Sequence, residues 1–406
     1  MIKSPARIVH LIEGLGSGGA ERFLYTILKH LDRSRFEAEV ITVFSSATHW
    51  KGPIEALGVK VTSLDCRRQR DWPKGVRRLR RLLRNSRPDL IHTHLWAANV
   101  IGRIAGRLNG APVISSVHSP DHGPDAWRYA LPVNPLKRWP MWLIDRWTAH
   151  FGCERILAVS EHVKRNAHDR LGFPLERIDL LYNPVDIDQF QSGDSSRRQK
   201  LLEELRLPEG SFILLNVARV LPLKGLQYAI RALPAVREKY PGAHLVSVGA
   251  VGDQRWLSIL ESEAASLGVG RYMRFLGERR DIPDLLRCCD LFVFPSLYEG
   301  LGISLIEAMA SGRACVASRT GPIPEAIRHG VDGWLAPPAD DRALADAICT
   351  LLADEDKRKR LGEAAAESAR ARFHPETTAG TLEGIYKSVL DKASSAAKRS
   401  CQSWPG

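Results

Sequence analysis

The sequence predicts an α/β protein with two doubly wound domains, each built on a parallel β-sheet. Two observations lead to this prediction. Short apolar segments, typical of buried strands, alternate with helical segments along both halves of the chain. The 406 residues are also too many for one ordinary hydrophobic core, and they suit two domains of about 200 residues each.

The predicted strands recur at short intervals through both halves of the chain. In the first half they are 7–12, 38–43, 59–64, 89–92, 112–117 and 155–159, and in the second half 212–217, 244–248, 273–276, 291–294, 314–317 and 334–335. A polar segment at 191–199 interrupts the alternation, which places the linker between domains near 185–205. We therefore expect domains at 1–185 and 186–375. Residues 376–406 should form a C-terminal helix that returns to the first domain, followed by a polar tail.

The overall composition is globular. Hydrophobic residues make up 44% of the chain and charged residues 26%, which excludes a disordered protein. No apolar run is long enough to span a bilayer, and the first residues lack the hydrophobic region of a signal peptide, so we expect a cytoplasmic protein. The seven cysteines form no CxxC pair and no spacing typical of metal ligands.

The positive charge is concentrated in the first half of the chain. Residues 1–185 contain 29 Lys and Arg against 17 Asp and Glu, whereas residues 186–406 contain 29 of each, so the first half accounts for the whole net charge of +12. Such an asymmetry favours an anionic partner for the first half, such as a membrane surface, a lipid phosphate or nucleic acid. The alternative is that the excess only improves solubility.

Two basic segments lie within this first half. Segment 67–87 has ten Lys and Arg, one acid, and an apolar stripe formed by Val76, Leu79, Leu82 and Leu83. We interpret it as a helix packed on a sheet with a solvated basic face, in preference to a membrane-bound helix. Segment 127–147 has four of the ten Trp residues together with Lys137 and Arg138. This interfacial composition favours a membrane-facing or lipid-acceptor role over a pocket wall or core helix.

The segment PSLYEGLGISLIE, residues 295–307, carries the strongest candidate site. It follows the predicted strand 291–294, so Glu299 and Gly302 should lie in a strand-to-helix turn and Glu307 in the helix. Open α/β sheets bind ligands at such turns, where helix amides attract an anion. Two carboxylates beside an anion site indicate a sugar nucleotide. The alternative is an ordinary helix start in which Glu299 complements the helix dipole.

Further candidates follow other predicted strands. Arg219 and Lys224 come after strand 212–217 and could clamp a diphosphate, although a surface loop with incidental charge is equally compatible. The glycine-rich turn at 13–21 has the form of a phosphate-type loop, but it matches neither the dinucleotide fingerprint nor the P-loop. His118 ends strand 112–117, where it could be a general base or a hydrogen-bond donor, or purely structural.

His92 and His94 lie two residues apart on a predicted strand. We interpret their side chains as pointing in opposite directions, and we therefore predict no metal site there.

Taken together, these segments resemble the family 4 retaining glycosyltransferases. The matching stretches, in order, are GSGGAER (16–22), SVH (116–118), YNPVD (182–186), ARVLPLKG (218–225), FLGERRDIPDLL (275–286), PSLYEGLGISLIEAMASG (295–312) and GPIPEAIRHGVDGWLAPP (321–338). The resemblance covers nearly the whole chain and is strongest over 210–340. It implies the GT-B fold, in which two Rossmann-like domains face each other across a deep cleft.

The resemblance also implies site roles. Glu299 would contact the hydroxyls of the donor sugar, and Glu307 the nucleotide ribose. Arg219 and Lys224 would hold the diphosphate, and His118 would face the donor sugar. The remaining donor-binding residues implied by the family are Gly16, Arg279, Ile282, Gly302, Ile303, Ser304 and Leu305. The chain departs from the family at Ala218, Leu301 and Pro322, which affects the shape of loops more than their charge.

The resemblance predicts an enzyme that transfers a sugar with retention from a UDP- or GDP-linked donor to a glycan or lipid-linked acceptor, in cell-surface polysaccharide synthesis. It would need no metal or other cofactor, and it would lie in the cytoplasm or peripherally on the inner face of an anionic membrane. Nucleic acid is not an expected partner, since no nucleic-acid motif accompanies the charge. Two alternatives are a sugar-nucleotide epimerase of the same architecture and a basic membrane-binding module with a degenerate donor site.

Overall fold

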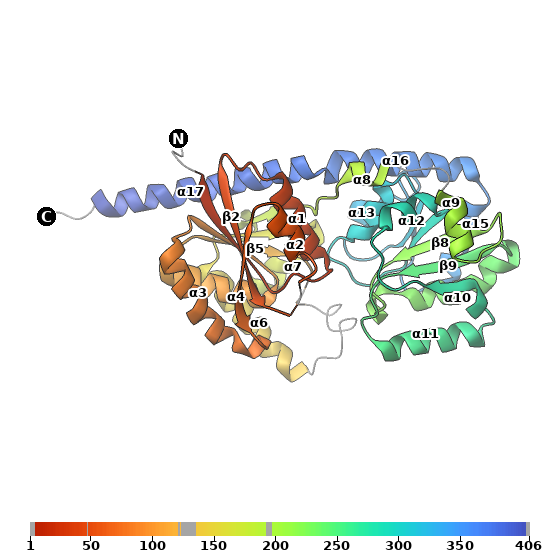
Figure 1. Ribbon diagram of the computed structural model, residues 1–406, viewed down its shortest axis with the longest axis horizontal. Coiled ribbons are helices and arrows are strands. Elements are labelled where there is room, and N and C mark those ends of the chain that lie inside the picture. The colour runs from red at the N-terminus through yellow and green to blue at the C-terminus, as the bar shows by residue number, and fades with distance from the viewer. Residues whose placement is uncertain (1–4, 47, 121, 123–134, 192–196, 403–406) are drawn as a thin grey trace. The chain divides into compact units, whose positions relative to one another are not determined.

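The computed structural model of the chain describes residues 5–46, 48–120, 122, 135–191 and 197–402 (Figure 1). The described residues form two compact units. The first unit comprises the chain up to residue 184 together with the C-terminal helix, and the second comprises residues 185–374. Each unit has its own sheet and hydrophobic core, and the two are described here one after the other.

The first unit is built on a seven-stranded parallel sheet with the order β3-β2-β1-β4-β5-β6-β7. Its strands are β1 (Ala6–Ile12), β2 (Phe36–Phe44), β3 (Lys60–Cys66), β4 (Leu90–His94), β5 (Val113–Val117), β6 (Arg155–Ala158) and β7 (Ile178–Leu180). The six predicted strands of this half are present. The seventh, β7, was missed because the central one of its three residues is an aspartate, which interrupts the apolar run.

Helices cover both faces of this sheet. They are α1 (Gly19–His30), α2 (Lys51–Ala56), α3 (Trp72–Ser86), α4 (Trp96–Asn109), α6 (Pro135–Gly152), α7 (Glu161–Leu171) and α17 (Pro375–Gln402). One core joins α3 and α4 to the sheet through apolar residues such as Leu79 and Ile101. A second core joins α1 and α17 to the sheet through Phe23 and Leu382, among others. In α3, Val76, Leu79 and Leu83 are buried as predicted, whereas Leu82 is exposed.

The C-terminal helix α17 belongs to the first unit through specific contacts. The Tyr386 hydroxyl lies 2.6 Å from Nδ1 of His92 in the buried core. The Glu383 carboxylate accepts hydrogen bonds from the backbone amide of Asp32 and from the Arg35 guanidinium, each at 2.9 Å. Polar bonds and apolar packing therefore fix the last helix to residues near the start of the chain.

The second unit is built on a six-stranded parallel sheet with the order β10-β9-β8-β11-β12-β13. Its strands are β8 (Phe212–Val217), β9 (Ala243–Val248), β10 (Met273–Phe275), β11 (Leu291–Phe294), β12 (Cys315–Ser318) and β13 (Trp334–Ala336). All six match predicted strands. The helices are α8 (Ile187–Gln191), α9 (Arg197–Glu204), α10 (Leu226–Lys239), α11 (Gln254–Ser266), α12 (Ile282–Cys288), α13 (Ile303–Ala310), α14 (Ile323–Ala326), α15 (Asp341–Leu352) and α16 (Glu355–Phe373). The predicted pair of doubly wound domains is thus confirmed.

Each sheet has a point where the strand order reverses. In the first unit this switch point lies between β1 and β4, and in the second it lies between β8 and β11. Ligands of open α/β sheets bind beyond the carboxyl ends of the two strands at such a point, because the connections leave in opposite directions there. Both predicted groups of site residues follow strands at or beside these switch points.

The predicted directions of His92 and His94 are wrong. Side chains of a strand alternate between faces, so residues two apart share a face. The two imidazole rings lie with their centroids 4.2 Å apart, on the face covered by α1 and α17. Within the described residues, no helix combines the length and hydrophobicity needed to cross a membrane.

Candidate functional site

Two loops meet at the switch point of the second unit. One follows β8 and contains Arg219 and the short 3-10 turn Pro222–Lys224, and the other follows β11 and begins at Pro295. Gly225 ends the first loop with a positive φ of 69°. A Cβ atom there would lie 1.9 Å from the carbonyl oxygen of Pro295, so only glycine allows the two loops to approach this closely.

Lys224 and Glu299 form an ion pair across these loops. Lys224 Nζ lies 2.6 Å from Glu299 Oε1, and the two side chains are only 17% and 9% exposed. The Ser296 hydroxyl donates to the same carboxylate oxygen at 2.6 Å. The backbone amide of Leu297 donates to the Leu223 carbonyl oxygen at 2.9 Å. The structure therefore brings together two predicted site residues and adds Ser296, which the sequence analysis missed.

Helix α13 begins directly beside this pair. Its N-cap is Gly302, whose φ of 90° lies in the region that favours glycine. The first amides of a helix, here those of Ile303 and Ser304, point out of its N-terminus and favour an anion, whereas the predicted amide of Leu305 already donates to the Gly302 carbonyl oxygen at 3.1 Å. Glu307 is on the same helix and is almost completely buried. The predicted carboxylates therefore flank a helix start, as the sequence pattern indicated.

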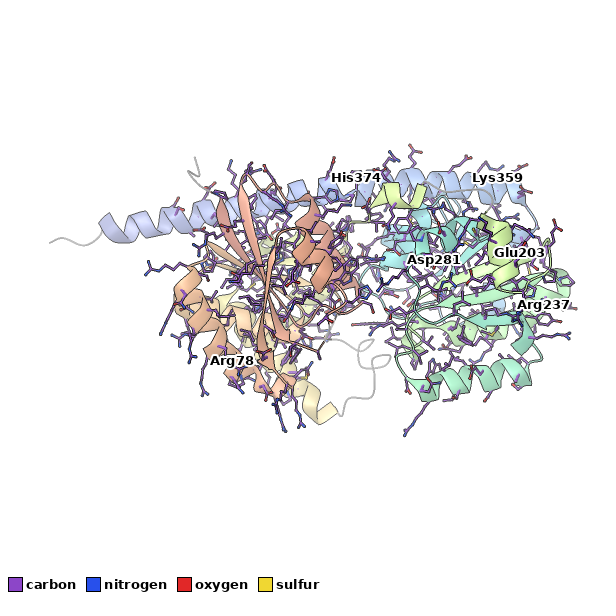
Figure 2. The ribbon with its side chains drawn as sticks, in the orientation of Figure 1. Arg78, Glu203, Arg237, Asp281, Lys359 and His374 are labelled. Carbon is purple, nitrogen blue, oxygen red and sulfur yellow. The ribbon has the colours of Figure 1, made fainter. Side chains whose placement is uncertain are left out.

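The other predicted residues of the second unit are more dispersed. Arg219 is exposed in the loop after β8. Arg279 binds the Asp281 carboxylate through two hydrogen bonds of 2.8 and 2.6 Å, and also binds Glu204 (Figure 2 labels Asp281). The Arg279 guanidinium lowers the pKa of the Asp281 carboxyl. Ile282 is buried at the start of α12. A role for Arg279 and Ile282 in a base pocket stays a prediction.

In the first unit, Gly16 lies in the turn between β1 and α1, and Gly18 is the N-cap of α1. Glu13 links this turn to α4, the helix that follows β4. Its carboxylate accepts a 2.7 Å hydrogen bond from the Ala97 amide at the start of that helix. His118 follows β5. These residues therefore lie at the carboxyl edge of the sheet, where the sequence analysis placed them.

His118 is one end of a chain of three imidazoles. His118 Nε2 lies 3.3 Å from Nδ1 of His94, and His94 Nε2 lies 3.2 Å from Nδ1 of His10. Burial lowers the pKa of His118 to about 4 and that of His10 to about 3, so these imidazoles are neutral near neutral pH. A neutral imidazole carries one N–H. Each ring in the row therefore donates through one nitrogen and accepts through the other, in the same direction. One end of the three-imidazole row then carries an N–H and the other end a lone pair.

The same cluster contains a group of three histidines with metal-ligand spacing. One ring nitrogen each of His10, His92 and His94 lies within 4.8 Å of the others. Both nitrogens of His92 are already hydrogen-bonded, one to Tyr386 and the other to the Ser116 hydroxyl at 2.8 Å. These bonds explain the cluster as a hydrogen-bonded core, and the expectation of no metal stays a prediction.

A buried ionic group in the first unit escaped the sequence analysis. Arg103, completely buried, binds the Asp145 carboxylate at 2.6 Å, and the other Asp145 oxygen lies 2.7 Å from His122 Nε2. Burial by itself would raise the pKa of Asp145, but Arg103 and His122 lower it overall. The residues are 42 and 23 positions apart in sequence, so no local pattern could have indicated the group.

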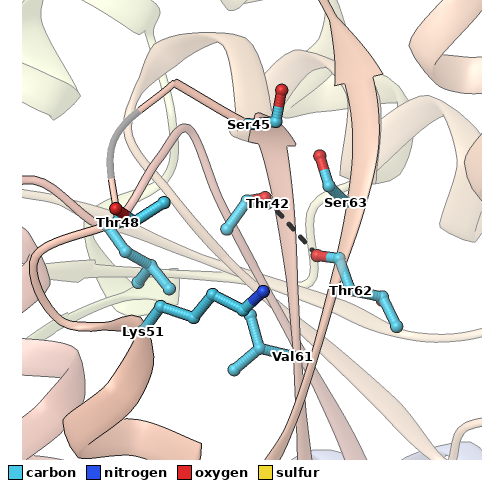
Figure 3. A pocket seen from close by; sticks show the side chains of 8 residues that line it. Thr42, Ser45, Thr48, Lys51, Val61, Thr62 and Ser63 are labelled. Atoms are coloured by element: carbon cyan, nitrogen blue, oxygen red, sulfur yellow. Dashed lines mark hydrogen bonds between the residues drawn. The ribbon is translucent and has the colours of Figure 1, made fainter.

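A small hollow lies elsewhere on the first unit, against β2 and β3 (Figure 3). It is lined by Leu15, Thr42, Ser45, Thr48, Lys51, Val61, Thr62 and Ser63. Its volume is about 90 Å³. Sites for small-molecule ligands usually exceed roughly 300 Å³. The hollow is therefore too small for a sugar nucleotide.

Comparisons with known proteins identify the family of the chain. Residues 17–189 match the model of Glycosyltransferase Family 4, and residues 197–368 match that of Glycosyl transferases group 1. D-inositol 3-phosphate glycosyltransferase of Salinispora arenicola is 30% identical over 319 residues, covering 74% of this chain and 69% of that protein. N-acetyl-alpha-D-glucosaminyl L-malate synthase of Bacillus anthracis is 30% identical over 59% of this chain and 62% of that protein.

Solved structures show the same architecture. Anabaena HepE in complex with UDP and glucose superposes with a TM-score of 0.81 and 25% identity, covering 94% of this chain and all of that chain. Sucrose-phosphate synthase from Thermosynechococcus elongatus, at 19% identity and a TM-score of 0.79, shares the fold. Fold and site define a nucleotide-sugar glycosyltransferase with the GT-B fold. The chain belongs to glycosyltransferase family 4, as its sequence motifs predicted.

Proposed function

We propose that this protein is a retaining hexosyltransferase that uses a UDP- or GDP-linked sugar. The observation that supports this most directly is the Lys224–Glu299 pair at the switch point between β8 and β11, beside the N-terminus of α13. Binding a diphosphate requires cations and amide donors, and binding a sugar requires a group that accepts hydrogen bonds from the sugar hydroxyls. The pair supplies both kinds of group within 2.6 Å of each other.

In this proposal, each group has a defined task. Glu299 accepts hydrogen bonds from the sugar hydroxyls, and Glu307 binds the ribose. Lys224, Arg219 and the first amides of α13 oppose the negative charge that develops on the leaving diphosphate. The neutral His118 provides a hydrogen bond to the sugar. The acceptor hydroxyl attacks the anomeric carbon from the same face that the nucleotide leaves, and an oxygen of the leaving phosphate takes its proton. The protein therefore supplies no nucleophile, and no metal is required.

The acceptor that we propose is a glycan or a lipid-linked glycan of the cell surface, modified at the cytoplasmic face of an anionic membrane. The basic first half of the chain supports this choice, because it contributes the whole net charge of +12. A second candidate is a small anionic acceptor. It is favoured by the names of the relatives, which specify D-inositol 3-phosphate and L-malate.

A donor screen tests the central proposal. The purified chain would be incubated with UDP-glucose, UDP-N-acetylglucosamine, GDP-mannose and related donors, and nucleotide release would be measured with and without EDTA. We expect release from one or two donors, unaffected by EDTA. No release from any donor, or conversion of a donor to its epimer without release, would contradict transferase function. Release that is abolished by EDTA would contradict only the metal-independent mechanism.

An acceptor screen with the active donor then separates the two acceptor classes. Lipid extracts and polysaccharide fragments would be compared with D-inositol 3-phosphate and L-malate, and the anomeric configuration of the product would be determined by NMR. We expect an extended glycan product with the configuration of the donor. Turnover with inositol phosphate or malate alone would replace the proposed acceptor, and an inverted product would exclude retention.

A further inference from the structure

Three neighbouring helices of the first unit present a distinct surface. Helix α3 packs against α4, and α4 packs against α6 (Figure 1). Most exposed side chains of these helices are apolar or cationic, and Asn85 and His150 are exposed as well. The surface, called here the basic aromatic face, comprises Lys74, Arg77, Arg81, Arg84, Arg107, Trp139, Leu143, Arg146, Trp147 and Phe151.

The apolar part of this face is a ridge along α6. Trp139, Leu143 and Trp147 are 57%, 50% and 56% exposed, and Phe151 is 37% exposed. Their spacing of four residues places them along one side of the helix. Asp145, Thr148 and Ala149 lie on the other side, which is buried. The rings of Trp147 and Phe151 stack with centroids 4.9 Å apart. The ridge is therefore a row of large apolar side chains that do not pack into the hydrophobic core of the described residues.

The cationic part of this face has few carboxylates near it, one being that of Asp71 at the N-cap of α3, which interacts with Lys74. Helices α3 and α4 contain no acidic residue, and the one acid of α6, Asp145, is buried between Arg103 and His122. Arg78 of α3 donates to the carbonyl oxygens of Leu64 and Asp65. The remaining cations of α3 are exposed or half-buried. Among the described residues of these three helices, every exposed charged side chain is positive.

We propose that the basic aromatic face binds the surface of an anionic lipid bilayer. Tryptophan and phenylalanine rings at an interface are stabilised between headgroups and acyl chains, while arginine and lysine bind lipid phosphates. The ridge on α6 enters the headgroup region, and the cations of α3 and α4 lie at the phosphate level. A second copy of the chain is disfavoured as the occupant, because a symmetric contact would place cations opposite cations.

This inference rests on the proposed peripheral membrane role and assigns it to particular residues. It also changes the interpretation of segment 67–87, whose solvated basic face becomes half of a binding surface. Trp127 and the side chains of Lys137 and Arg138 lie outside the described part of the chain, so the inference uses residues of this segment only from Trp139 onward.

Vesicle sedimentation of the full chain tests the inference. Phosphatidylcholine vesicles with and without phosphatidylglycerol would be compared at low and high salt. We expect binding that requires phosphatidylglycerol and that falls by about tenfold or more at high salt. Trp139→Ser with Trp147→Ser should lower binding by about tenfold or more at either salt concentration. Arg77→Ser with Arg81→Ser should reduce the salt dependence of binding, because two of the six cations of the face are lost.

Matched controls separate this result from misfolding and from the proposed enzyme activity. Ile259→Ser removes a side chain of similar exposure, 53%, from α11 of the second unit and should leave vesicle binding unchanged. All variants should release nucleotide from the soluble donor as the parent does. Equal binding to both kinds of vesicle, full binding by the Trp variant, or a dimer that the Trp variant abolishes would overturn the inference. Vesicle binding without donor turnover would count against the proposed transferase function alone.

Discussion

The two sheets of this protein share a strand order but carry opposite chemistry at their switch points. In the first unit, the strands β1 and β4 place His10, His92 and His94 side by side, and burial keeps these imidazoles neutral. In the second unit, the loops after β8 and β11 place a cation and an anion in contact, Lys224 and Glu299. The same topology thus supports a neutral hydrogen-bonding network in one unit and a paired charge site in the other.

The difference shows how the surroundings decide whether a polar group stays charged. The histidines lie on a sheet face that α1 and α17 cover with apolar side chains, where an unpaired charge would be costly. Lys224 and Glu299 keep partial contact with solvent and neutralise each other. Neutral imidazoles suit hydroxyl groups, whereas a cation beside helix amides suits a diphosphate. The predictions below test this contrast, from the largest expected effect to the smallest.

Acid should destabilise the first unit more than the second. The pKa of His10 falls from its ordinary value of 6.5 to about 3 on folding, and those of His92, His94 and His118 are also lowered. The unfolded chain therefore binds more protons below about pH 6.5, and stability is lost progressively as the pH falls toward the folded values. With four such groups we expect a loss on the order of several kcal/mol.

Hydrogen exchange of the full chain at about pH 7.5 and about pH 5 would measure this effect. Protection in β1, β4 and α17 should fall more than protection in β8 and β11. His10→Gln should reduce the difference, because glutamine does not titrate. Equal loss of protection in both units would show that the buried histidines do not control acid stability.

Lys224→Met should produce the largest loss of activity. The substitution removes a cation from the proposed diphosphate site, so we expect kcat/KM for the donor to fall roughly 10²–10³-fold. Lys359→Met is a matched control, since Lys359 pairs with Glu355 at 2.9 Å on the surface and both side chains are more than 60% exposed (Figure 2). Unchanged activity of the Lys224 variant, with thermal stability preserved, would remove Lys224 from the donor site.

Glu299→Gln should have a smaller effect. Glutamine keeps the size and one acceptor oxygen but loses the charge, so hydrogen bonds to the sugar weaken by about 1.5–3 kcal/mol, or roughly 10- to 100-fold in kcat/KM. The comparison with Glu263→Gln, which removes a carboxylate bound to Arg231, controls for loss of an ion pair in the same unit. Equal effects of the two substitutions would argue against a direct sugar contact by Glu299.

Tyr386→Phe should have the smallest effect. It removes the hydroxyl that lies 2.6 Å from His92 Nδ1, and a typical buried hydrogen bond contributes about 1 kcal/mol. Urea unfolding would measure the loss, and hydrogen exchange should locate it in α17 and β4. Tyr228→Phe, in the partly buried surroundings of the second unit, serves as the control. No change in α17 protection would mean that apolar packing and the Glu383 hydrogen bonds hold the helix without the Tyr386 hydroxyl.

Particular elements show how far the sequence could be interpreted. All twelve predicted strands exist, because each is a mainly apolar run, and only β7, a three-residue strand with Asp179 at its centre, was missed. The glycine turns at Gly225 and Gly302 could be located because their glycines precede helical patterns. The directions of His92 and His94 were misjudged, and the partners of Arg103 and Tyr386 could not be inferred, since they lie on distant segments.

The sequence by itself determined the alternation of strands and helices, the residue types in each turn and the family to which the chain belongs. The tertiary structure alone decided which of those residues meet. Lys224 and Glu299 are 75 positions apart, and His92 and Tyr386 are 294 apart. Local propensity fixes each element, but contact between distant side chains depends on strand order and on the face that each side chain occupies, and both arise only when the sheet assembles.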